Sequence, residues 1–290
     1  MHSVPPSGII TSGKAMKNRY KLSKYNAAFL EYDDYDNNDR YISATTLLKP
    51  TREILINRLW KSEPFEDVSD KIAMKIGTGV HNLRESTPYS DCLMREERLF
   101  CSLEKFGIEE FGISGKPDLV DFDYNQPQIE SDDGLVVIED LKVSSLMKLK
   151  FGDFSDYILQ LSILKYLALR DEQFGNLLDS RQIKQVEESF SKFGIITFMA
   201  KDWSSRNSDL MPIPIQEIPL ELIDDSAIEK RIERKCREIQ TYWHLDRQEQ
   251  FPLCSDKIIQ KYNGKNCLKY CSARFNCQKS PVFEGQVEKN

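Results

Sequence analysis

Apolar residues recur along the chain with two different periods, and together these periods predict an α/β fold. Spacing typical of helices occurs in three stretches, at residues 43–59, 68–85 and 157–170. Short apolar runs typical of strands occur in four, at residues 108–113, 116–122, 135–141 and 194–200. The order of these elements predicts a central mixed β-sheet flanked by helices, in which the first three strands form a meander. Gly77 and Gly79 are expected to interrupt the second helix.

The same pattern divides the chain into four parts. Residues 1–40 combine proline and glycine with an acidic run and predict a partly disordered tail, whereas residues 41–205 carry the periodic segments of the core. Residues 206–250 begin with three prolines and continue into a charged helix over about 226–245, whose charged face predicts a solvated surface. Residues 251–290 are short, basic and rich in cysteine, which predicts a separate C-terminal segment.

Composition narrows the location and the partners. The chain has no apolar run near the roughly 20 residues that a membrane span needs, and its N-terminus lacks the apolar core of a signal peptide. We therefore expect a cytoplasmic protein. The net charge of −6 disfavours nucleic acid as a partner, so that binding to DNA would depend on local clusters of lysine and arginine.

Two acidic residues and a lysine form the first candidate site. Asp118 follows a Gly-Lys-Pro turn, and Asp140 lies late in an apolar run, so antiparallel pairing of the two predicted strands would bring the carboxylates together. Lys142 follows Asp140 by two residues and shares its face of the strand. Such a group can hold a hard divalent cation, Mg²⁺ or Mn²⁺, at a phosphodiester and activate water. By itself, a D-x-K triplet is more often an exposed strand end.

Four sequence blocks supply the context that an isolated triplet lacks. They are IGTGVH at 76–81 with Glu85, SGKPD at 114–118, IEDLKVSS at 138–145 and QLS at 160–162. Over residues 41–280 the chain resembles the RecB-like branch of the PD-(D/E)XK nuclease superfamily, which includes CRISPR-associated nucleases and bacteriophage exonucleases. The family often places a tyrosine four residues after the glutamine, where this chain has Leu164.

The resemblance extends the expected site. It implies that His81, Asp118 and Asp140 are metal ligands together with the peptide carbonyl of Leu141, and that Gln160 helps to hold the site or the DNA. By sequence alone, a single histidine such as His81 is more often a packing residue. Glu85 lies one helical turn after His81 and is expected to support it. Strand alternation points Glu139 to the opposite face and excludes it.

Four cysteines near the C-terminus form a second candidate site: Cys254, Cys267, Cys271 and Cys277. Clustered cysteines in a reduced compartment indicate metal binding rather than disulfides, and four thiolates suit either zinc or a [4Fe-4S] cluster. The related nucleases bind iron and sulfur with three closely spaced cysteines after the core, so the resemblance favours the cluster, with Zn²⁺ as the alternative. Chance packing of small cysteines is the remaining explanation.

The cysteine-rich segment is also locally basic. Between residues 254 and 279 it has six basic residues against one acidic residue, with aromatic residues between them. Such a segment suits a DNA backbone, although ordinary solvated lysines give the same pattern. A further basic pair, Lys148 and Lys150, follows Lys142.

The function that the sequence predicts best is a metal-dependent DNA exonuclease in bacterial or phage recombination, repair or processing. The expected partners are DNA with a free end or a single strand and, as a further candidate, a recombination or repair protein, with no membrane. The alternatives are a CRISPR-associated or restriction-type endonuclease, and a non-catalytic DNA-binding module on the nuclease scaffold.

Overall fold

The computed structural model describes residues 16–32, 40–60, 67–88, 92–121, 136–171, 190 and 192–283. The chain divides into two compact units, of which the smaller comprises Met1–Asp36 and Phe65–Ile76 and the larger comprises Asn37–Pro64 and Gly77–Asn290. All residues of both candidate sites belong to the larger unit.

The smaller unit contains a short helix where the sequence predicted a tail. Helix α1 covers Lys24–Glu31 and begins at Ser23, whose hydroxyl accepts a hydrogen bond from the amide of Asn26. Lys17 pairs with Asp67 at an isolated bridge, and a short 3₁₀-helix, Val68–Lys71, follows. Part of the expected tail is therefore structured. Residues 1–15 and 33–39 lie outside the described residues.

The larger unit contains two β-sheets. In the first, of order β1-β4-β3, the strands are β1 (Tyr41–Ser43), β4 (Gly112–Gly115) and β3 (Leu99–Cys101). In the second, of order β2-β5-β6-β7-β8, they are β2 (Met94–Arg95), β5 (Leu119–Asp121), β6 (Val137–Ser144), β7 (Phe193–Ala200) and β8 (Ile215–Glu221). β6 and β7 are parallel, and the other neighbours in this second sheet are antiparallel. The mixed sheet of an α/β protein is thus present.

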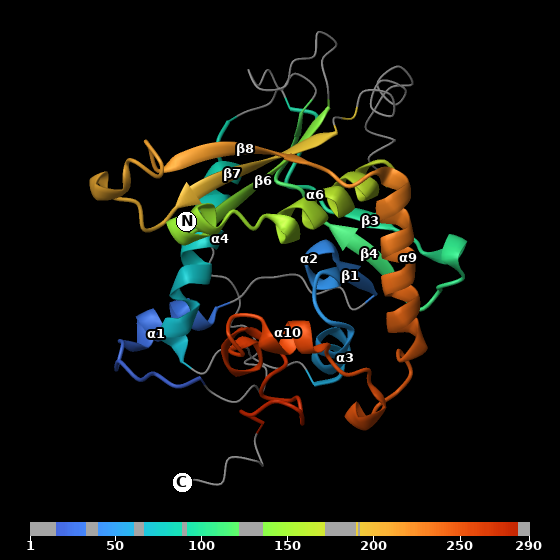
Figure 1. The fold of residues 1–290 in the computed structure, drawn as a ribbon. Helices are drawn as coiled ribbons and strands as arrows, with labels where there is room; N and C mark the ends of the chain where they lie inside the picture. The colour runs from blue at the N-terminus through green and yellow to red at the C-terminus, as the bar shows by residue number, and fades with distance from the viewer. Residues whose placement is uncertain are drawn as a thin grey trace, which may run out of the picture. The chain divides into compact units, whose positions relative to one another are not determined.

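Helix α6, Ser155–Ala168, packs against strands of both sheets. It contacts β6 and β7 of the larger sheet and β3 and β4 of the smaller one, and it lies between them in Figure 1. Its residues from Gln160 to Ala168 are all buried, because a helix covered on opposite sides has no solvated face. Gly115 in β4 allows the close approach, since a Cβ there would lie 2.5 Å from Leu164.

Other helices complete the larger unit. They are α2 (Ala44–Leu47), α3 (Thr51–Trp60), α5 (Leu146–Phe151), α9 (Asp225–Thr241) and α10 (Asp256–Gln260), while α4 (Ile72–Glu85) begins in the smaller unit and ends in the larger. The charged helix expected after the prolines is α9, which buries one apolar face against α6 and α3: Ile228, Ile232, Cys236 and Ile239.

Several local predictions need correction. The helix expected over 43–59 is two helices, because Pro50 lacks an amide hydrogen and disfavours helical geometry at the residue before it. Gly77 and Gly79 lie inside a continuous α4 and do not interrupt it. The three-strand meander is wrong as well, because β4 pairs in the other sheet and only β5 and β6 are neighbours.

The largest correction concerns the proline-rich stretch. β8 lies within it and pairs with β7, with Pro219 opposite Ile195. A proline is tolerated there because β8 ends the strand order of its sheet and needs hydrogen bonds on one side only. The boundary predicted at residue 205 therefore falls inside the sheet. In the part of the chain that the structure describes, no helix is long and apolar enough to cross a membrane.

Candidate functional site

Pairing of β5 with β6 brings the two predicted carboxylates together. Leu119 opposes Glu139 in this antiparallel ladder, so one further step in the same register sets Asp118 opposite Asp140. Beyond the paired residues of the two strands, the amide of Leu141 donates a 2.5 Å hydrogen bond to the side-chain oxygen Oδ2 of Asp118. Asp118 and Asp140 are both buried, at 6% and 3% exposure.

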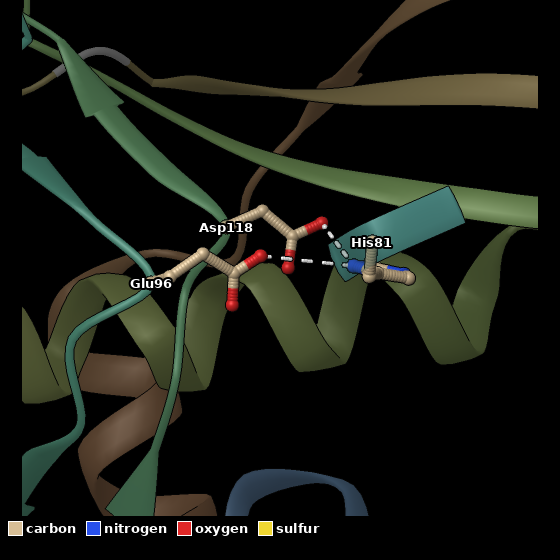
Figure 2. Close-up of side chains that lie close together, drawn as sticks. All are labelled: His81, Glu96 and Asp118. Carbon is tan, nitrogen blue, oxygen red and sulfur yellow. Dashed lines mark ion pairs between the residues drawn. The ribbon is translucent and has the colours of Figure 1, made fainter. Parts of the chain in front are cut away.

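Helix α4 places a histidine beside Asp118, and Figure 2 shows it with Glu96. Nδ1 of His81 lies 3.4 Å from Oδ2 of Asp118 and 3.8 Å from Oε1 of Glu96. Among the described residues, these three form the one group of histidine, cysteine and acidic side chains whose ligand atoms all lie within 4.8 Å of one another. The imidazole and two carboxylates therefore converge on one point from three segments.

Glu96 is the member of this group that the sequence analysis missed. It follows β2, a strand of only two residues, and has a left-handed backbone with φ of 53°. Its amide donates to the carbonyl of Asp118, and Nζ of Lys116 lies 2.7 Å from its Oε2. The exposed carboxylate of Glu85 is 4.0 Å from the same lysine, and the expected support of His81 by Glu85 stays a prediction. No sequence block contained Glu96, so only its spatial position identifies it.

Asp140, Lys142 and Gln160 form the other side of the site. Lys142 makes a short ion pair with Asp140 from two residues further along β6. Nε2 of Gln160, in α6, donates a 3.4 Å hydrogen bond to Oδ1 of Asp140. All predicted side chains of the site, from four separate segments, thus meet in the larger unit. The direction of the Leu141 carbonyl stays a prediction.

Two pKa shifts describe the electrostatics of the site. Hydrogen bonds to Asp118 and then to Glu96 raise the pKa of His81 to about 10, against burial, so the imidazole is protonated at neutral pH without a metal. Burial raises the pKa of Asp140 to about 6, which Lys142 opposes and the charge of Asp118 reinforces. For Glu96 burial acts upward, but hydrogen bonds with His81 and Lys116 leave the pKa below its usual value. Without a metal at neutral pH, a protonated His81 therefore lies between the carboxylates of Asp118 and Glu96.

Glu139 is occupied elsewhere. It makes a short ion pair with Arg84 of α4 and accepts a short hydrogen bond from the hydroxyl of Thr197. Arg84 also lies 3.9 Å from Asp118, so one guanidinium bridges the two acids. These contacts agree with the exclusion of Glu139 from the expected ligand set.

The donor set fits a hard divalent cation. Carboxylate oxygens from Glu96 and Asp118 with one imidazole nitrogen match the ligands that Mg²⁺ and Mn²⁺ accept, and Asp140 adds a carboxylate adjacent to Asp118. A bound cation would replace the proton on His81 and relieve the crowding of carboxylates. Among the described residues, these side chains are the candidate ligands for such a cation.

The cysteine-rich segment is fastened to helix α3. Oε1 of Glu53 accepts hydrogen bonds from the amide and hydroxyl of Ser272, at 3.0 and 2.5 Å. Arg52 donates to the carbonyl of Gln248 at 2.9 Å and to Sγ of Cys277 at 3.4 Å. These buried polar side chains hold the segment against the core, and within the segment Asn263 and Gly264 have left-handed φ angles.

The four predicted cysteines share one neighbourhood. Burial raises the pKa of Cys254 to about 11 and that of Cys271 to about 12, and the charges of Cys267 and Cys277 add to both shifts. Tetrahedral zinc at about 2.3 Å from each sulfur would hold the sulfurs roughly 3.8 Å apart. Within the described residues, however, no three of the four sulfurs lie within 4.8 Å of one another. The metal of this segment stays a prediction.

The remaining cysteines and the basic residues of the cysteine-rich segment differ in how far their side chains are buried. Cys101 and Cys236 are buried in the apolar core, while Cys92 is partly exposed. Of the six basic residues in the cysteine-rich segment, five are exposed: Lys257, Lys261, Lys265, Lys269 and Lys279. Arg274 is buried and donates to the carbonyl of Cys271, so it belongs to the segment's own packing and not to a DNA surface.

Comparison with known proteins identifies a similar fold. No protein-family model and no curated protein matches the sequence. Among solved structures, the chain is similar to the crystal structure of SSO0001, with a TM-score of 0.51 and 16% sequence identity over 88% of this chain and 95% of that chain. At this identity the similarity concerns the fold, an α/β arrangement shared over most of both chains.

Proposed function

We propose that this protein is a divalent-metal-dependent deoxyribonuclease of the PD-(D/E)XK type. The observation that carries the proposal is the meeting of Asp118, Asp140 and Lys142 with His81 of α4 beside the β5–β6 ladder. Acids and a lysine placed at this spacing on one strand and its neighbour form the arrangement that metal-assisted phosphodiester hydrolysis requires.

His81, Glu96, Asp118 and Asp140 would hold the metal. When bound there, Mg²⁺ or Mn²⁺ supplies positive charge to the scissile phosphate and makes a water more acidic. The protein fixes the ligands in advance: Asp118 by the amide of Leu141, Glu96 by Lys116, and Asp140 by Gln160. Such supporting contacts keep ligand geometry constant while substrate binds.

Lys142 would act on the attacking water. Its ammonium group pairs with Asp140, and its side chain is 21% exposed. The group can therefore contact both this metal ligand and a substrate bound from solvent. A cation there orients the water and stabilises negative charge on the phosphate as the bond breaks. Gln160 is buried and only orients Asp140.

DNA is the proposed substrate because an exposed basic segment accompanies the site. Five exposed lysines of the cysteine-rich segment offer phosphate contacts that the net charge of −6 would otherwise disfavour. Exonucleolytic action in recombination, repair or processing, and a [4Fe-4S] cluster or zinc in that segment, rest on the order of the four sequence blocks and on the cysteine spacing.

The test is digestion of end-labelled linear DNA and covalently closed circles, with Mg²⁺ and with chelator. We expect degradation of the linear DNA only, and only with metal. Lys142→Ala should lower the rate about 10²- to 10⁴-fold, the usual contribution of a group that moves or orients a proton. Lys230→Ala, an exposed lysine of α9, removes the same charge and should change little.

Each other outcome has a definite meaning. Undiminished activity of folded Lys142→Ala would refute the proposed catalytic site. Cutting of closed circles would indicate an endonuclease. Binding of DNA without degradation under either metal would indicate the non-catalytic module.

A further inference from the structure

The first turns of α6 extend the site beyond Asp140 and Lys142. Alternation along β6 places Ser144 on the same face as these two residues, and Tyr157 lies three residues before Gln160 on the same side of α6. Nζ of Lys142 is 5.8 Å from the centre of the Tyr157 ring, and burial raises the pKa of the Tyr157 phenol, which the charge of Lys142 and the Ser144 side chain oppose. Tyr157 therefore lies beside Lys142 on this face of the site.

A second lysine reaches the same ring from α5. Nζ of Lys148 lies 4.8 Å from the ring centre of Tyr157. The start of α5 is fixed by Asp202, which accepts hydrogen bonds from the hydroxyl of Ser145 at 2.5 Å and from the amide of Leu146 at 2.8 Å. Among the described residues, Lys148 makes no ion pair within 4.0 Å; its ammonium group lies over this aromatic face, and its charge also acts on the carboxylate of Asp153.

A third lysine comes from the cysteine-rich segment. Lys261 follows α10, and its Nζ lies 3.4 Å from Oδ2 of Asp156 at the start of α6. Asp153, just before α6, has a pKa below its usual value because of hydrogen bonds from Ser155, and the charges of Lys148 and Lys261 both lower it further. Lys148 of α5 and Lys261 of the cysteine-rich segment therefore both lie near the residues at the start of α6.

We propose that Lys148, Tyr157 and Lys261 bind the backbone of the DNA strand next to the cleaved bond, along a path from the metal site over the start of α6 to the cysteine-rich segment. This path, the α6 track, rests on the proposed nuclease function and names how its substrate is held. The phenol of Tyr157 offers a hydrogen bond or a stacking face, and the two ammonium groups contact successive phosphates.

The arrangement favours a strand over a small ligand. Lys142 and Lys148, from β6 and α5, both lie against the ring of Tyr157, and Lys261 of the cysteine-rich segment pairs with the adjacent Asp156, so three segments bring positive charge to the start of α6. A polyanion can offer a separate phosphate to each lysine, and each phosphate so neutralised releases a counterion. Asp156 holds Lys261 in place until a phosphate competes for it.

The first test measures binding of a fluorescent single-stranded oligonucleotide by the full chain in chelator, at several salt concentrations. Lys148→Gln and Lys261→Gln should each weaken binding about tenfold and reduce the slope of log affinity against log salt by about 0.7, the value for one phosphate of a single strand. The double variant should lose about twice that slope. Lys230→Gln is the charge-matched control and should keep the wild-type slope.

The second test locates the contact. A single neutral methylphosphonate is moved along the oligonucleotide, and kcat/KM for cleavage is measured with Mg²⁺. At the position contacted by Lys148, the neutral linkage should slow wild-type cleavage about tenfold and cause no additional loss in Lys148→Gln. Tyr157→Phe, which keeps the ring, should be milder than Tyr157→Ala.

The outcomes separate the two proposals. Wild-type affinity and salt slope in both lysine variants, with DNA degradation intact, would overturn the α6 track and leave the nuclease proposal standing. A wild-type protein that neither binds nor degrades DNA would overturn both.

Discussion

The backbone amide of Leu141 donates a hydrogen bond of 2.5 Å to the carboxylate of Asp118. The same oxygen, Oδ2, lies 3.4 Å from Nδ1 of His81. A main-chain donor in the middle of a buried strand is rigid, so the fold itself sets the position of this carboxylate before any metal or substrate arrives.

Replacement of Asp118 by asparagine should separate the structure of the site from its chemistry. The amide oxygen of Asp118→Asn can still accept from Leu141, so the thermal midpoint should stay near that of the wild type. The lost charge should lower Mg²⁺-dependent DNA degradation by at least about 100-fold, because metal ligands are required for the cation's action. Activity assays and thermal melts of the same preparation check both halves. A large loss of stability would show that the charge also supports the fold.

Glu96 should behave as a metal ligand. Glu96→Gln keeps the size of the side chain but removes a charge 3.8 Å from His81, and we expect Mn²⁺ affinity to fall at least about tenfold. Glu85→Gln is the matched control, because Glu85 is exposed and its carboxylate lies 4.0 Å from Nζ of Lys116. Calorimetric titration with Mn²⁺ measures both. Equal affinities in the two variants would restrict the ligand set to the residues that the sequence predicted.

Metal binding should release a proton from His81. Its pKa of about 10 in the metal-free protein means that the imidazole is charged at pH 7.5 and must lose its proton to bind a cation. Metal affinity should therefore rise with pH, by up to about tenfold per unit while His81 remains protonated. Calorimetry in two buffers of different ionisation enthalpy counts the protons, and His81→Asn should abolish this release.

The same shift sets a pH dependence of folding. The folded pKa of about 10 exceeds the ordinary value of 6.5, so the charged imidazole stabilises the metal-free fold fully below pH 6.5. This contribution should decline as the pH rises from 6.5 through 10. Denaturant melts of the wild type and His81→Asn in chelator across this range test the sign, since the difference between the two proteins should shrink with increasing pH.

The cysteine-rich segment should carry a bound metal. Protein purified without oxygen should show either broad visible absorption from a [4Fe-4S] cluster or zinc by elemental analysis. Cys271→Ser should lose the metal and lower the thermal midpoint, because metal binding adds to folding free energy. Cys236→Ala is the control, since Cys236 is buried in α9 with burial raising its pKa to about 12. If the purified wild-type protein contains no metal and Cys271→Ser leaves the thermal midpoint unchanged, chance packing of the cysteines is the explanation that remains.

Two glycines should respond to alanine in opposite directions. A Cβ at Gly115 would lie 2.5 Å from Leu164 and 2.7 Å from Leu167, both buried in α6, so Gly115→Ala should destabilise the fold by about 1–3 kcal/mol. A Cβ at Gly79, inside α4, would meet nothing within 4 Å, and Gly79→Ala should stabilise by about 0.5–1 kcal/mol through helix propensity. Chemical denaturation curves measure both. A neutral Gly115→Ala would mean that α6 can move away from β4 without cost.

Short-range patterns determined much of the fold. Periodicity located α6, β7 and α9 because each buries a regular apolar face or run, and that regularity is written in the sequence. It failed for strands of two or three residues, such as β2 and β3, because so few positions carry no period. It failed also for β8, where prolines signal a loop unless the strand is known to lie at the end of a sheet.

The candidate site shows the same division. The sequence by itself determined Asp118, Asp140 and Lys142, because strand alternation and hairpin-like pairing are local rules, and the order of the blocks added His81 and Gln160. Only the tertiary structure brought in Glu96 and Tyr157, and only it placed Lys261, one of the basic residues of the C-terminal segment, beside the start of α6. Their places depend on contacts between segments far apart in the chain, and such contacts are set by packing of the whole core and not by the spacing of residues along it.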